Sequence, residues 1–319
     1  MSEVLSRIFT DEILARLRKC KHYSRSAEFR HRVICSLPPV GDSAYTQQFY
    51  EQTRARWNRW VGAAISIGLF EDPYGAELKA RLTGVDHDGF RSALGECMTC
   101  WALSSELGMH LRPRPSGRAG CVLEFAVQMN GSDISFEVKS PRLPSAIAHG
   151  TDPLSARATS IYSTAIAIRA ALRSANRQFA AECPNVLVIA MPEAEVPARV
   201  ECYENWPAAL IRALYGEQRL STVASGTSAS RFVAEGNFLK RTGGVARFTR
   251  ISAVIGLQEI AGEPELGAAV FHNPFSQNRV DCSIFGQWDQ FGAVNGAIYS
   301  FRFGPQRGEP DILEDRHYS

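Results

Sequence analysis

A hairpin pattern near the middle of the chain constrains the fold more than any other feature of the sequence. The segments CVLEFAVQM and SDISFEVKS both alternate apolar and polar residues with the period of a half-buried strand. Asn130 and Gly131 stand between them, and Asn-Gly is the strongest short signal for a two-residue hairpin turn. With these two residues as the turn, Met129 pairs with Ser132, and this pairing fixes the register of the whole hairpin.

This register brings charged side chains of both strands to one face. Glu124 lies directly opposite Glu137, with β-carbons about 4.5–5.5 Å apart, and Lys139 follows on the same face. Phe125 and Phe136 pair on the other face, which we expect to be core. Two opposed carboxylates repel each other, whereas a divalent cation between them is favourable because Mg²⁺ prefers carboxylate oxygens. The pattern therefore predicts a metal site. An ordinary hairpin whose charges face water is the alternative.

Helical patterns precede the hairpin. Residues 1–85 show helical rather than strand periodicity, and residues 90–107 predict an amphipathic helix that ends at Gly108. Glu96 lies beside the apolar stripe of this second helix. The prolines and glycines of residues 111–120 predict a loop between the helix and the hairpin.

A helix and a buried strand follow the hairpin. Residues 158–181 predict a long helix with one apolar seam, and NVLVIAMP predicts a strand that is buried on both faces. This succession is typical of a mixed α/β sheet covered by helices on both sides. Further along, we expect a helix around 206–215, a Ser/Gly/Thr-rich loop near 221–230, and strands in FTRISAVIGLQ and AAVFHNP.

The order of these elements resembles the PD-(D/E)XK nuclease superfamily, which has the restriction-endonuclease-like fold. A glutamate on a helix, an acid on a strand, a hairpin, a Glu-X-Lys motif, a glutamine on the next helix and an apolar strand occur in the expected order. The matching residues, which the resemblance implies to be catalytic or metal-binding, are Glu96, Glu124, Glu137, Val138, Lys139 and Gln178.

The resemblance also implies a role for each residue. Glu124 and Glu137 would bind Mg²⁺ or Mn²⁺, and the backbone carbonyl of Val138 could join them. Lys139 would position the attacking water, and Glu96 would bind metal or water from the preceding helix. The family usually has aspartate where this chain has Glu124, whose extra methylene moves the carboxylate by about one bond length.

Composition excludes several classes of protein. Of the 319 residues, 45% are hydrophobic and 21% charged, which indicates a globular rather than a disordered or fibrous chain. No stretch reaches the roughly 18 apolar residues of a membrane span. The charged start MSEVLSRIFTDEILARLRKC is not a secretory signal, so the eight scattered cysteines are expected to be reduced and the protein to be cytoplasmic. Because the net charge is only +2, any nucleic-acid footprint must be local.

Arginines and lysines gather locally in three places. Residues 16–32 and 112–118 hold basic clusters, for which a solvated surface is the favoured interpretation. Arg169, Arg173 and Arg177 recur every four residues along the long helix, a spacing that could lay three guanidinium groups along a phosphate backbone. A solvated helix flank explains the same spacing equally well.

Other candidate sites have weaker support. Cys97 and Cys100 have the spacing of half a zinc site, but no second pair accompanies them, so packed thiols are the favoured interpretation. His272, followed by Asn-Pro, predicts the end of a strand and a turn more than a catalytic histidine. Neither a G-x-S-x-G elbow nor a phosphate-binding glycine motif occurs, so serine-hydrolase and nucleotide-hydrolase chemistry are not expected.

We therefore expect an α/β protein with a mixed central sheet flanked by helices. A helical N-terminal region (1–85) precedes a restriction-endonuclease-like core (86–195), on which an α/β C-terminal extension (196–319) packs. The predicted function is a metal-dependent endonuclease, a phosphodiesterase acting on nucleic acid with DNA as the expected substrate. Cutting both strands of a duplex with one site per chain would favour a homodimer. The alternatives are a nuclease-like fold that only binds nucleic acid or protein, and a purely structural α/β protein.

Overall fold

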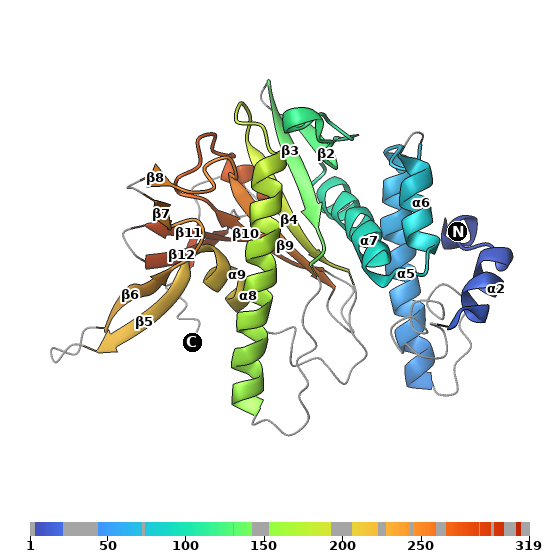
Figure 1. Cartoon of the computed structure of the whole chain (residues 1–319), viewed down its shortest axis with the longest axis horizontal. Helices are drawn as coiled ribbons and strands as arrows, with labels where there is room; N and C mark the ends of the chain where they lie inside the picture. Colours follow the sequence, from blue (N-terminus) through green and yellow to red (C-terminus); the bar gives the residue numbers. More distant parts are fainter. Residues whose placement is uncertain are drawn as a thin grey trace.

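A mixed β-sheet between two layers of helices forms the centre of the protein (Figure 1). The N-terminal helices cover one face of the sheet, and two later helices cover the other. The computed structural model describes residues 4–21, 44–71, 74–129, 131–141, 153–192, 206–222, 228–242, 245–259, 266–286, 288–294, 297–302 and 311–313. Asn130, the first residue of the predicted turn, lies outside these ranges.

Seven α-helices and three short helical turns are found among the described residues. The α-helices are α1 (Val4–Ile8), α2 (Asp11–Lys19), α5 (Ala44–Ser66), α6 (Gly75–Thr83), α7 (His87–Trp101), α8 (Pro153–Gln178) and α9 (Trp206–Leu214). The short turns are a π-helix η1 (Ala102–Glu106) and the 3-10 helices η2 (Arg118–Gly120) and η4 (Cys282–Phe285). Within the described ranges, no helix has both the length and the apolar character needed to span a membrane.

Nine of the described strands form the central sheet, in the order β1-β2-β3-β4-β9-β10-β11-β12-β13. The strands are β1 (Leu111–Pro113), β2 (Phe125–Met129), β3 (Ser132–Lys139), β4 (Asn185–Met191), β9 (Ala253–Glu259), β10 (Leu266–His272), β11 (Asp289–Val294), β12 (Ala297–Arg302) and β13 (Asp311–Leu313). Strands β1 to β3 form an antiparallel meander, and β4 then runs parallel to both β3 and β9. The predicted mixed α/β sheet is therefore confirmed.

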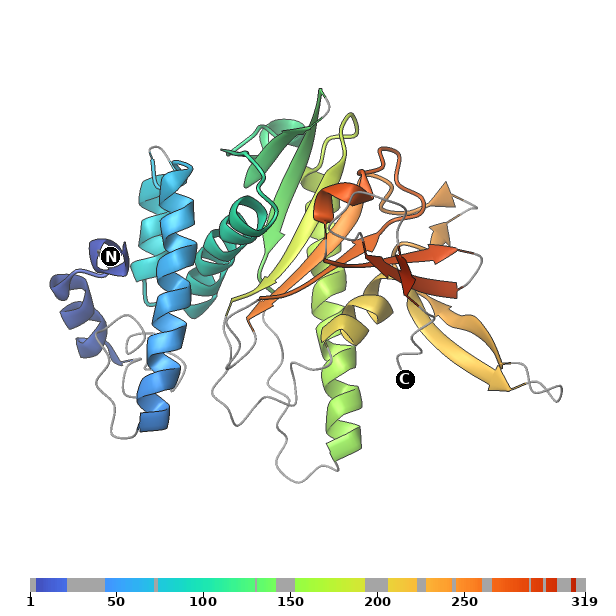
Figure 2. The ribbon, with the colours of Figure 1, turned by 180° about the vertical axis from the view of Figure 1, so that it is seen from behind.

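Two small hairpins lie outside the central sheet. They are β5 (Gly216–Thr222) with β6 (Ser228–Glu235), and β7 (Arg241–Thr242) with β8 (Val245–Ala246). The β5–β6 hairpin projects away from the body of the molecule, as Figure 2 shows from behind. The prediction of a loop near 221–230 is therefore wrong at both ends, because strand residues enter that range from either side.

The face of the sheet toward α7 is the larger part of the core. Phe136 and Val138 of β3 belong to this apolar cluster, together with Trp57 of α5 and Phe90 of α7, whose ring centroids are 5.4 Å apart. Because side chains alternate along a strand, Glu137 lies on the opposite face. The position of α7 between α5 and the sheet is visible in Figure 1.

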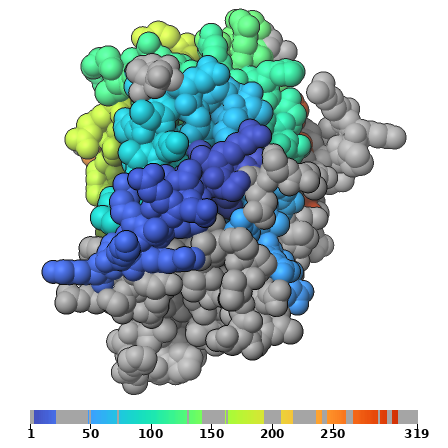
Figure 3. Space-filling model, turned by 90° about the vertical axis from the view of Figure 1, so that its right-hand side faces the viewer, coloured from blue at the N-terminus to red at the C-terminus, as the bar shows by residue number. Residues whose placement is uncertain are grey.

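The N-terminal helices form an outer layer over α5 and α6. The backbone N–H of Leu5 in α1 donates to Asn58 Oδ1 in α5 at 2.8 Å. Figure 3 shows this side, with α1 and α2 in dark blue lying across the lighter blue helices. The helical character predicted for residues 1–85 is confirmed for the described part, and residues 22–43 lie outside it.

The opposite face of the sheet is covered by α8 and α9. Ile168 and Leu172 of α8 belong to one buried cluster with Leu187 and Ile189 of β4, as the predicted apolar seam requires. Proline is well suited to the first position of α8 because the first N–H groups of a helix have no partner within it. The long helix therefore crosses from β3 to β4 against the face that carries Glu137.

The prediction of a loop over residues 111–120 is wrong at its start, where strand β1 pairs with β2. Pro113 is compatible with this strand because β1 is at the edge of the described sheet and needs hydrogen bonds on one side only. Strands β11 to β13 were not predicted either. Strand β9 confirms the strand expected in FTRISAVIGLQ, and β10 confirms the one expected in AAVFHNP.

Candidate active site

The β2–β3 hairpin has the register that an Asn-Gly turn predicts. Phe125 pairs with Phe136, and Met129 pairs with Ser132. Gly131 has a φ of +79°, a conformation that glycine adopts at little cost and that tight hairpin turns require. The predicted pairing is therefore confirmed over the whole of β2.

The hairpin does not extend as far as Glu124, and here the sequence prediction is wrong. The backbone N–H of Arg114 donates to the carbonyl of Glu124, and the N–H of Leu123 donates to the carbonyl of Pro115, both at 3.0 Å. These bonds continue the β1–β2 pairing, while β2 and β3 separate. Leu123 consequently joins the cluster under α8, although Val138, its expected partner, faces α7.

The side chain of Glu124 spans the gap between the separating strands. Its Oε2 atom accepts a hydrogen bond from the backbone N–H of Val138 at 3.0 Å. Ser135 donates in the opposite direction, to Pro184 next to β4, so alternate N–H groups of β3 point to opposite sides. The carboxylate therefore occupies the position where the backbone carbonyl of Leu123 would accept if the hairpin continued.

Glu124, which is half-buried, lies close to the fully buried Glu137. Burial raises the pKa of Glu124 well above its ordinary value, and the neighbouring Glu137 carboxyl raises it further, through a hydrogen bond and through its charge. The charge of Glu96 acts in the same direction, and that of Lys139 opposes it. A carboxyl in this position is stabilised either by a proton or by a cation.

Glu137 has one oxygen with a partner and one without. Its side chain is fully buried, and Lys139 Nζ contacts Oε1 from the end of β3, where the lysine side chain is 28% exposed. The Oε2 atom is buried and has no hydrogen-bond partner among the described residues. Because an unpaired buried acceptor costs about 1–3 kcal/mol, this oxygen is an open position for a proton or a metal ion. We call Glu124, Glu137 and Lys139 the hairpin group.

Glu96, in contrast, is bound by two arginines. Its Oε1 atom is 2.7 Å from Arg81 Nη1, and its Oε2 atom accepts from Arg81 Nη2 at 3.2 Å and from Arg114 Nη2 at 3.1 Å. Arg81 lies on α6, and Arg114 follows β1 with a φ of +54°, which is uncommon for a residue with a side chain. We call Glu96, Arg81 and Arg114 the arginine group.

The two groups carry opposite net charge. With all side chains ionised, the hairpin group has two acids and one base, whereas the arginine group has one acid and two bases. Glu96 raises the pKa of Glu124, so the groups are close enough to interact electrostatically. The hairpin group therefore favours a cation. The arginine group beside it favours an anion less strongly than its own charges suggest, because the exposed Glu77 lies 3.7 Å from Arg81 Nε.

Gln178 is the last residue of α8, as the resemblance requires of a glutamine on the helix after the motif. Its Oε1 atom is buried without a hydrogen-bond partner in the described part of the chain. Its backbone carbonyl closely approaches Gly117, where a β-carbon would come within 2.9 Å of the oxygen. Gln178 thus packs beside η2, and within the described ranges no hydrogen bond joins its side chain to the hairpin group.

The oxygen atoms of the hairpin group fit a hard divalent cation. Among the described residues, no group of three His, Cys, Asp or Glu side chains could hold a metal ion. The N–H and C=O of a strand residue point to the same side, so the carbonyl of Val138 faces the gap that Glu124 occupies. Glu124, Glu137 and this carbonyl supply three oxygens, which suits Mg²⁺ because it keeps several of its waters.

A second polar cluster, which the sequence did not predict, surrounds His272. This histidine is the last residue of β10, as expected, with Nε2 2.8 Å from Gln290 Oε1 and Nδ1 3.7 Å from Cys282 Sγ. Burial lowers the pKa of His272 and raises that of Cys282. The pair is therefore neutral, and a neutral thiol is a poor nucleophile. Parallel pairing of β10 with β11 brings these residues together, which no local pattern could indicate.

Cys97 and Cys100 have the properties of packed thiols. Both are fully buried in the cluster against α7, and burial raises the pKa of both, that of Cys100 to about 12. Metal ligation requires the thiolate, so burial opposes it, and no second ligand pair accompanies these thiols among the described residues. The other free cysteines in the described part of the chain include Cys121, Cys183 and Cys282.

Comparison with family models, with curated proteins and with solved structures finds no match to this chain. A function must therefore be inferred from the chemistry of the site. A fold by itself would in any case be compatible with many activities. The hairpin group combines one buried and one half-buried acid, one partly exposed base and one unsatisfied oxygen, and this combination carries the inference.

Proposed function

We propose that this protein is a divalent-metal-dependent nuclease that hydrolyses phosphodiester bonds, with DNA as the expected substrate. The observation that carries the proposal is the meeting of the Glu124 and Glu137 carboxyls beside Lys139, with one buried oxygen left unpaired. The element order supports it. A helix with Glu96, a three-stranded meander, a crossover helix and a parallel strand follow one another as in a PD-(D/E)XK core.

In this proposal Glu124, Glu137 and the carbonyl of Val138 hold Mg²⁺ or Mn²⁺. The cation, when bound, supplies a Lewis acid for the phosphoryl group and removes the repulsion between the two carboxylates. Hydrolysis forms a bond from water oxygen to phosphorus and breaks the bond to the leaving oxygen, which takes up a proton. Lys139 is the one partly exposed cation of the hairpin group, and its ammonium orients the water and stabilises negative charge on the phosphate.

Glu96 has a positioning role in this scheme. Its oxygens are already used by Arg81 and Arg114, so its effect on substrate passes through the two guanidinium groups. Arginine forms paired hydrogen bonds with phosphate, and the net positive charge of the arginine group would favour the phosphodiester. Gln178, with its unpaired amide oxygen, would act from the end of α8.

Cleavage assays with matched variants test the proposal. Purified full-length protein is incubated with plasmid and with single-stranded DNA in Mg²⁺, in Mn²⁺ and in EDTA. The Glu137→Ala and Lys139→Ala variants are expected to lose cleavage, while Asp133→Asn, on the exposed part of the same hairpin, is expected to retain it. Cleavage that survives both of the first two substitutions would contradict the site.

Metal binding gives a readout that does not depend on activity. Calorimetric titration with Mn²⁺ is expected to show one site in the wild-type protein. The same titration should show none in a Glu124→Gln, Glu137→Gln double variant, which keeps similar side-chain volumes. Equal heats for the two proteins would show that the hairpin group does not hold the ion.

A nuclease-like fold that binds nucleic acid without cutting it is the second candidate. The observation in its favour is that internal partners already engage four acidic oxygens: two on Glu96, one on Glu124 and one on Glu137. This candidate predicts a gel shift with DNA and no cleavage under any metal condition. The expected homodimer and the cytoplasmic location belong to the nuclease proposal, and sedimentation with and without duplex DNA would test the dimer.

A further inference from the structure

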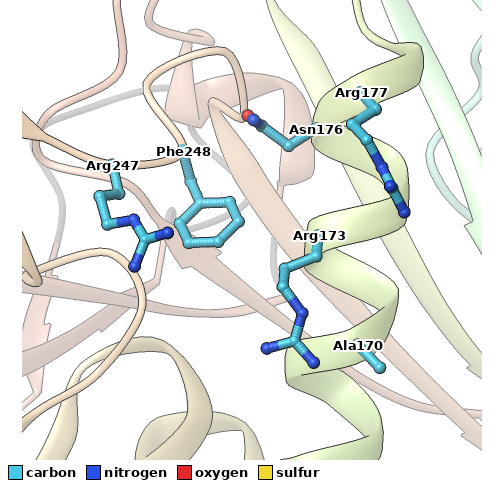
Figure 4. A pocket seen from close by; sticks show the side chains of 6 residues that line it. All are labelled: Ala170, Arg173, Asn176, Arg177, Arg247 and Phe248. Atoms are coloured by element: carbon cyan, nitrogen blue, oxygen red, sulfur yellow. The ribbon is translucent and has the colours of Figure 1, made fainter.

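A second charged region lies on α8, between that helix and the segment that follows β8 (Figure 4). The cavity there has a volume of about 600 Å³, within the range of about 300–1,000 Å³ that is common for small-molecule sites. We call it the α8 pocket. The residues that line it are Ala170, Arg173, Asn176, Arg177, Arg247 and Phe248.

Among the residues that the structure describes, the arginines of the α8 pocket have no acidic partner. No carboxylate lines the cavity, and within the described part of the chain none of Arg173, Arg177 and Arg247 forms an ion pair. Arg169, one turn earlier on the helix, differs from them because it donates to the backbone carbonyl of Arg212 at 3.2 Å. Three guanidinium groups that line one cavity carry like charge, and a bound anion offsets it.

An aromatic ring is held in the same cavity by an unusual backbone conformation. Phe248 has a φ of +58°, which is rare for a bulky residue and requires support from its surroundings. Its carbonyl accepts from the N–H of Ile251 at 3.0 Å and from Asn273 Nδ2 at 3.1 Å. Figure 4 shows the ring between Arg247 and Arg173, with the Arg247 guanidinium 5.8 Å from its centroid.

The pocket also contains an unsatisfied acceptor. Asn176 Oδ1 is buried and has no hydrogen-bond partner among the described residues. An amide oxygen in this state is stabilised by a ligand that brings an N–H or O–H group. A ligand for this cavity therefore combines an anion, a planar face and a hydrogen-bond donor.

We infer that the α8 pocket binds one nucleotide of a single-stranded nucleic acid. Arg173, Arg177 and Arg247 hold the phosphate, the base lies against Phe248, and Asn176 Oδ1 accepts from an amino or hydroxyl group of the nucleotide. Aromatic side chains and arginines together form the usual platforms for unpaired bases. In a duplex the bases are already stacked and paired, so they cannot cover the ring.

The choice of a nucleic-acid strand rests on the proposed nuclease function, whereas anion binding by the three arginines does not. A free nucleotide offers the same phosphate and base, and inorganic phosphate offers the anion alone. The three sources are distinguished by competition against a labelled strand.

Fluorescence anisotropy with a labelled single-stranded oligonucleotide tests the inference. Full-length protein in EDTA, where no metal supports cleavage, is compared with Arg173→Gln, Arg247→Gln and Phe248→Leu, and with Arg18→Gln, an exposed arginine on α2, as the matched control. Each pocket arginine variant is expected to weaken binding and to lower the slope of log affinity against log salt by about 0.7. Phe248→Leu is expected to weaken binding about fivefold or more without changing the slope, and Phe248→Tyr to retain it.

Each possible result decides the inference. Wild-type affinity in the three pocket variants, or an equal loss in Arg18→Gln, would overturn it. Displacement of the strand by inorganic phosphate, with no effect of Phe248→Leu, would reduce the pocket to an anion site. Displacement by a free nucleoside monophosphate at the affinity of the strand would make it a free-nucleotide site.

Cleavage by the same variants separates this inference from the proposed function. Normal strand binding without any cleavage would contradict the proposed nuclease function and leave the inference about the α8 pocket standing. Normal cleavage with no change in binding across the pocket variants would contradict the inference about the α8 pocket and leave the proposed nuclease function standing. Thermal melting followed by circular dichroism shows whether each variant is folded.

Discussion

Two buried glutamates near the β2–β3 hairpin differ in how completely the protein satisfies them. Glu96 is 2% exposed, and two arginines occupy its carboxylate oxygens. Glu137 is 0% exposed, shares one lysine with Glu124, and keeps one oxygen without a partner in the described structure. A buried charged group whose oxygens are all paired stabilises the folded state. A buried charged group with an unpaired oxygen is stabilised further when it binds a proton, a cation or a substrate. The first should therefore matter mainly for stability and the second mainly for activity.

The largest expected effect is on the rate of cleavage. Glu137→Gln removes a proposed metal ligand and is expected to lower kcat/KM by about 10²–10³-fold, the usual range for losing one electrostatic contact to a transition state. The melting temperature should not fall, because the change also removes repulsion between Glu137 and the neighbouring Glu124. Single-turnover cleavage and a thermal melt measure the two quantities. A large drop in stability with a small drop in rate would show instead that Glu137 matters mainly for stability.

Glu96→Gln is expected to show the opposite pattern. The change removes the buried counter-charge of Arg81 and Arg114, leaving Arg81 only the exposed Glu77 at 3.7 Å. It should lower the free energy of unfolding by about 2–4 kcal/mol, somewhat less than for a fully buried pair because Arg81 is partly exposed. Urea denaturation measures this loss. The matched control is Arg112→Gln, which breaks an exposed pair with Asp133 and should cost less than about 1 kcal/mol. Similar losses in both variants would show that the arginine group is not a special structural element.

The pH dependence of stability sharpens the comparison further. The pKa of Glu124 is raised in the folded protein, so the folded state holds this proton more tightly than the unfolded chain does. Its contribution to stability is fully present below the ordinary pKa of 4.5 and is lost as pH rises through the folded-state pKa. In EDTA, the melting temperature of the wild-type protein should therefore fall as pH rises above 4.5. This fall should be steeper than that of the Glu124→Gln variant.

Adding a metal ion should oppose this fall of the melting temperature with rising pH, and the expected change is smaller than the preceding ones. A cation competes with the proton for the Glu124 and Glu137 carboxyls, so Mn²⁺ is expected to raise the melting temperature more at pH 8 than at pH 5. The size of the rise at a given concentration follows from the affinity. A rise of equal size at both pH values, or in the Glu137→Gln variant, would place the ion elsewhere on the protein.

The elements that local sequence could predict are those with strong periodicity or a distinctive turn. The hairpin register followed from Gly131 and its neighbour, and the seam of α8 followed from apolar residues such as Leu172. Strand β1 is three residues long and contains a proline, so its existence depends on β2 and not on its own propensity. The two short hairpins, β5–β6 and β7–β8, could likewise not be predicted from composition, because residues typical of loops form their strands.

The candidate site was predictable in its residues and not in its pairing. Glu96, Glu124, Glu137 and Lys139 stand out in the sequence, and the fold brings them into one region. That Arg81 and Arg114 would bind Glu96 could not be predicted, because α6, α7 and the segment after β1 meet only in the tertiary structure. The same holds for the α8 pocket. Its helix arginines were visible as a four-residue repeat, but Phe248 comes from a distant segment.

The separation of β2 from β3 has a consequence for the proposed nuclease motif. Where the two strands part, the carboxylate of Glu124 must reach across to the N–H of Val138. An aspartate at this position, shorter by one carbon–carbon bond of about 1.5 Å, would fall short of that hydrogen bond. The longer side chain thus compensates for a displaced backbone and delivers the carboxylate to the neighbourhood of Glu137. A motif of this kind is defined by where the carboxylate oxygens lie in space. A sequence pattern that requires aspartate would miss a chain in which a longer glutamate places its carboxylate at the same position from a more distant backbone.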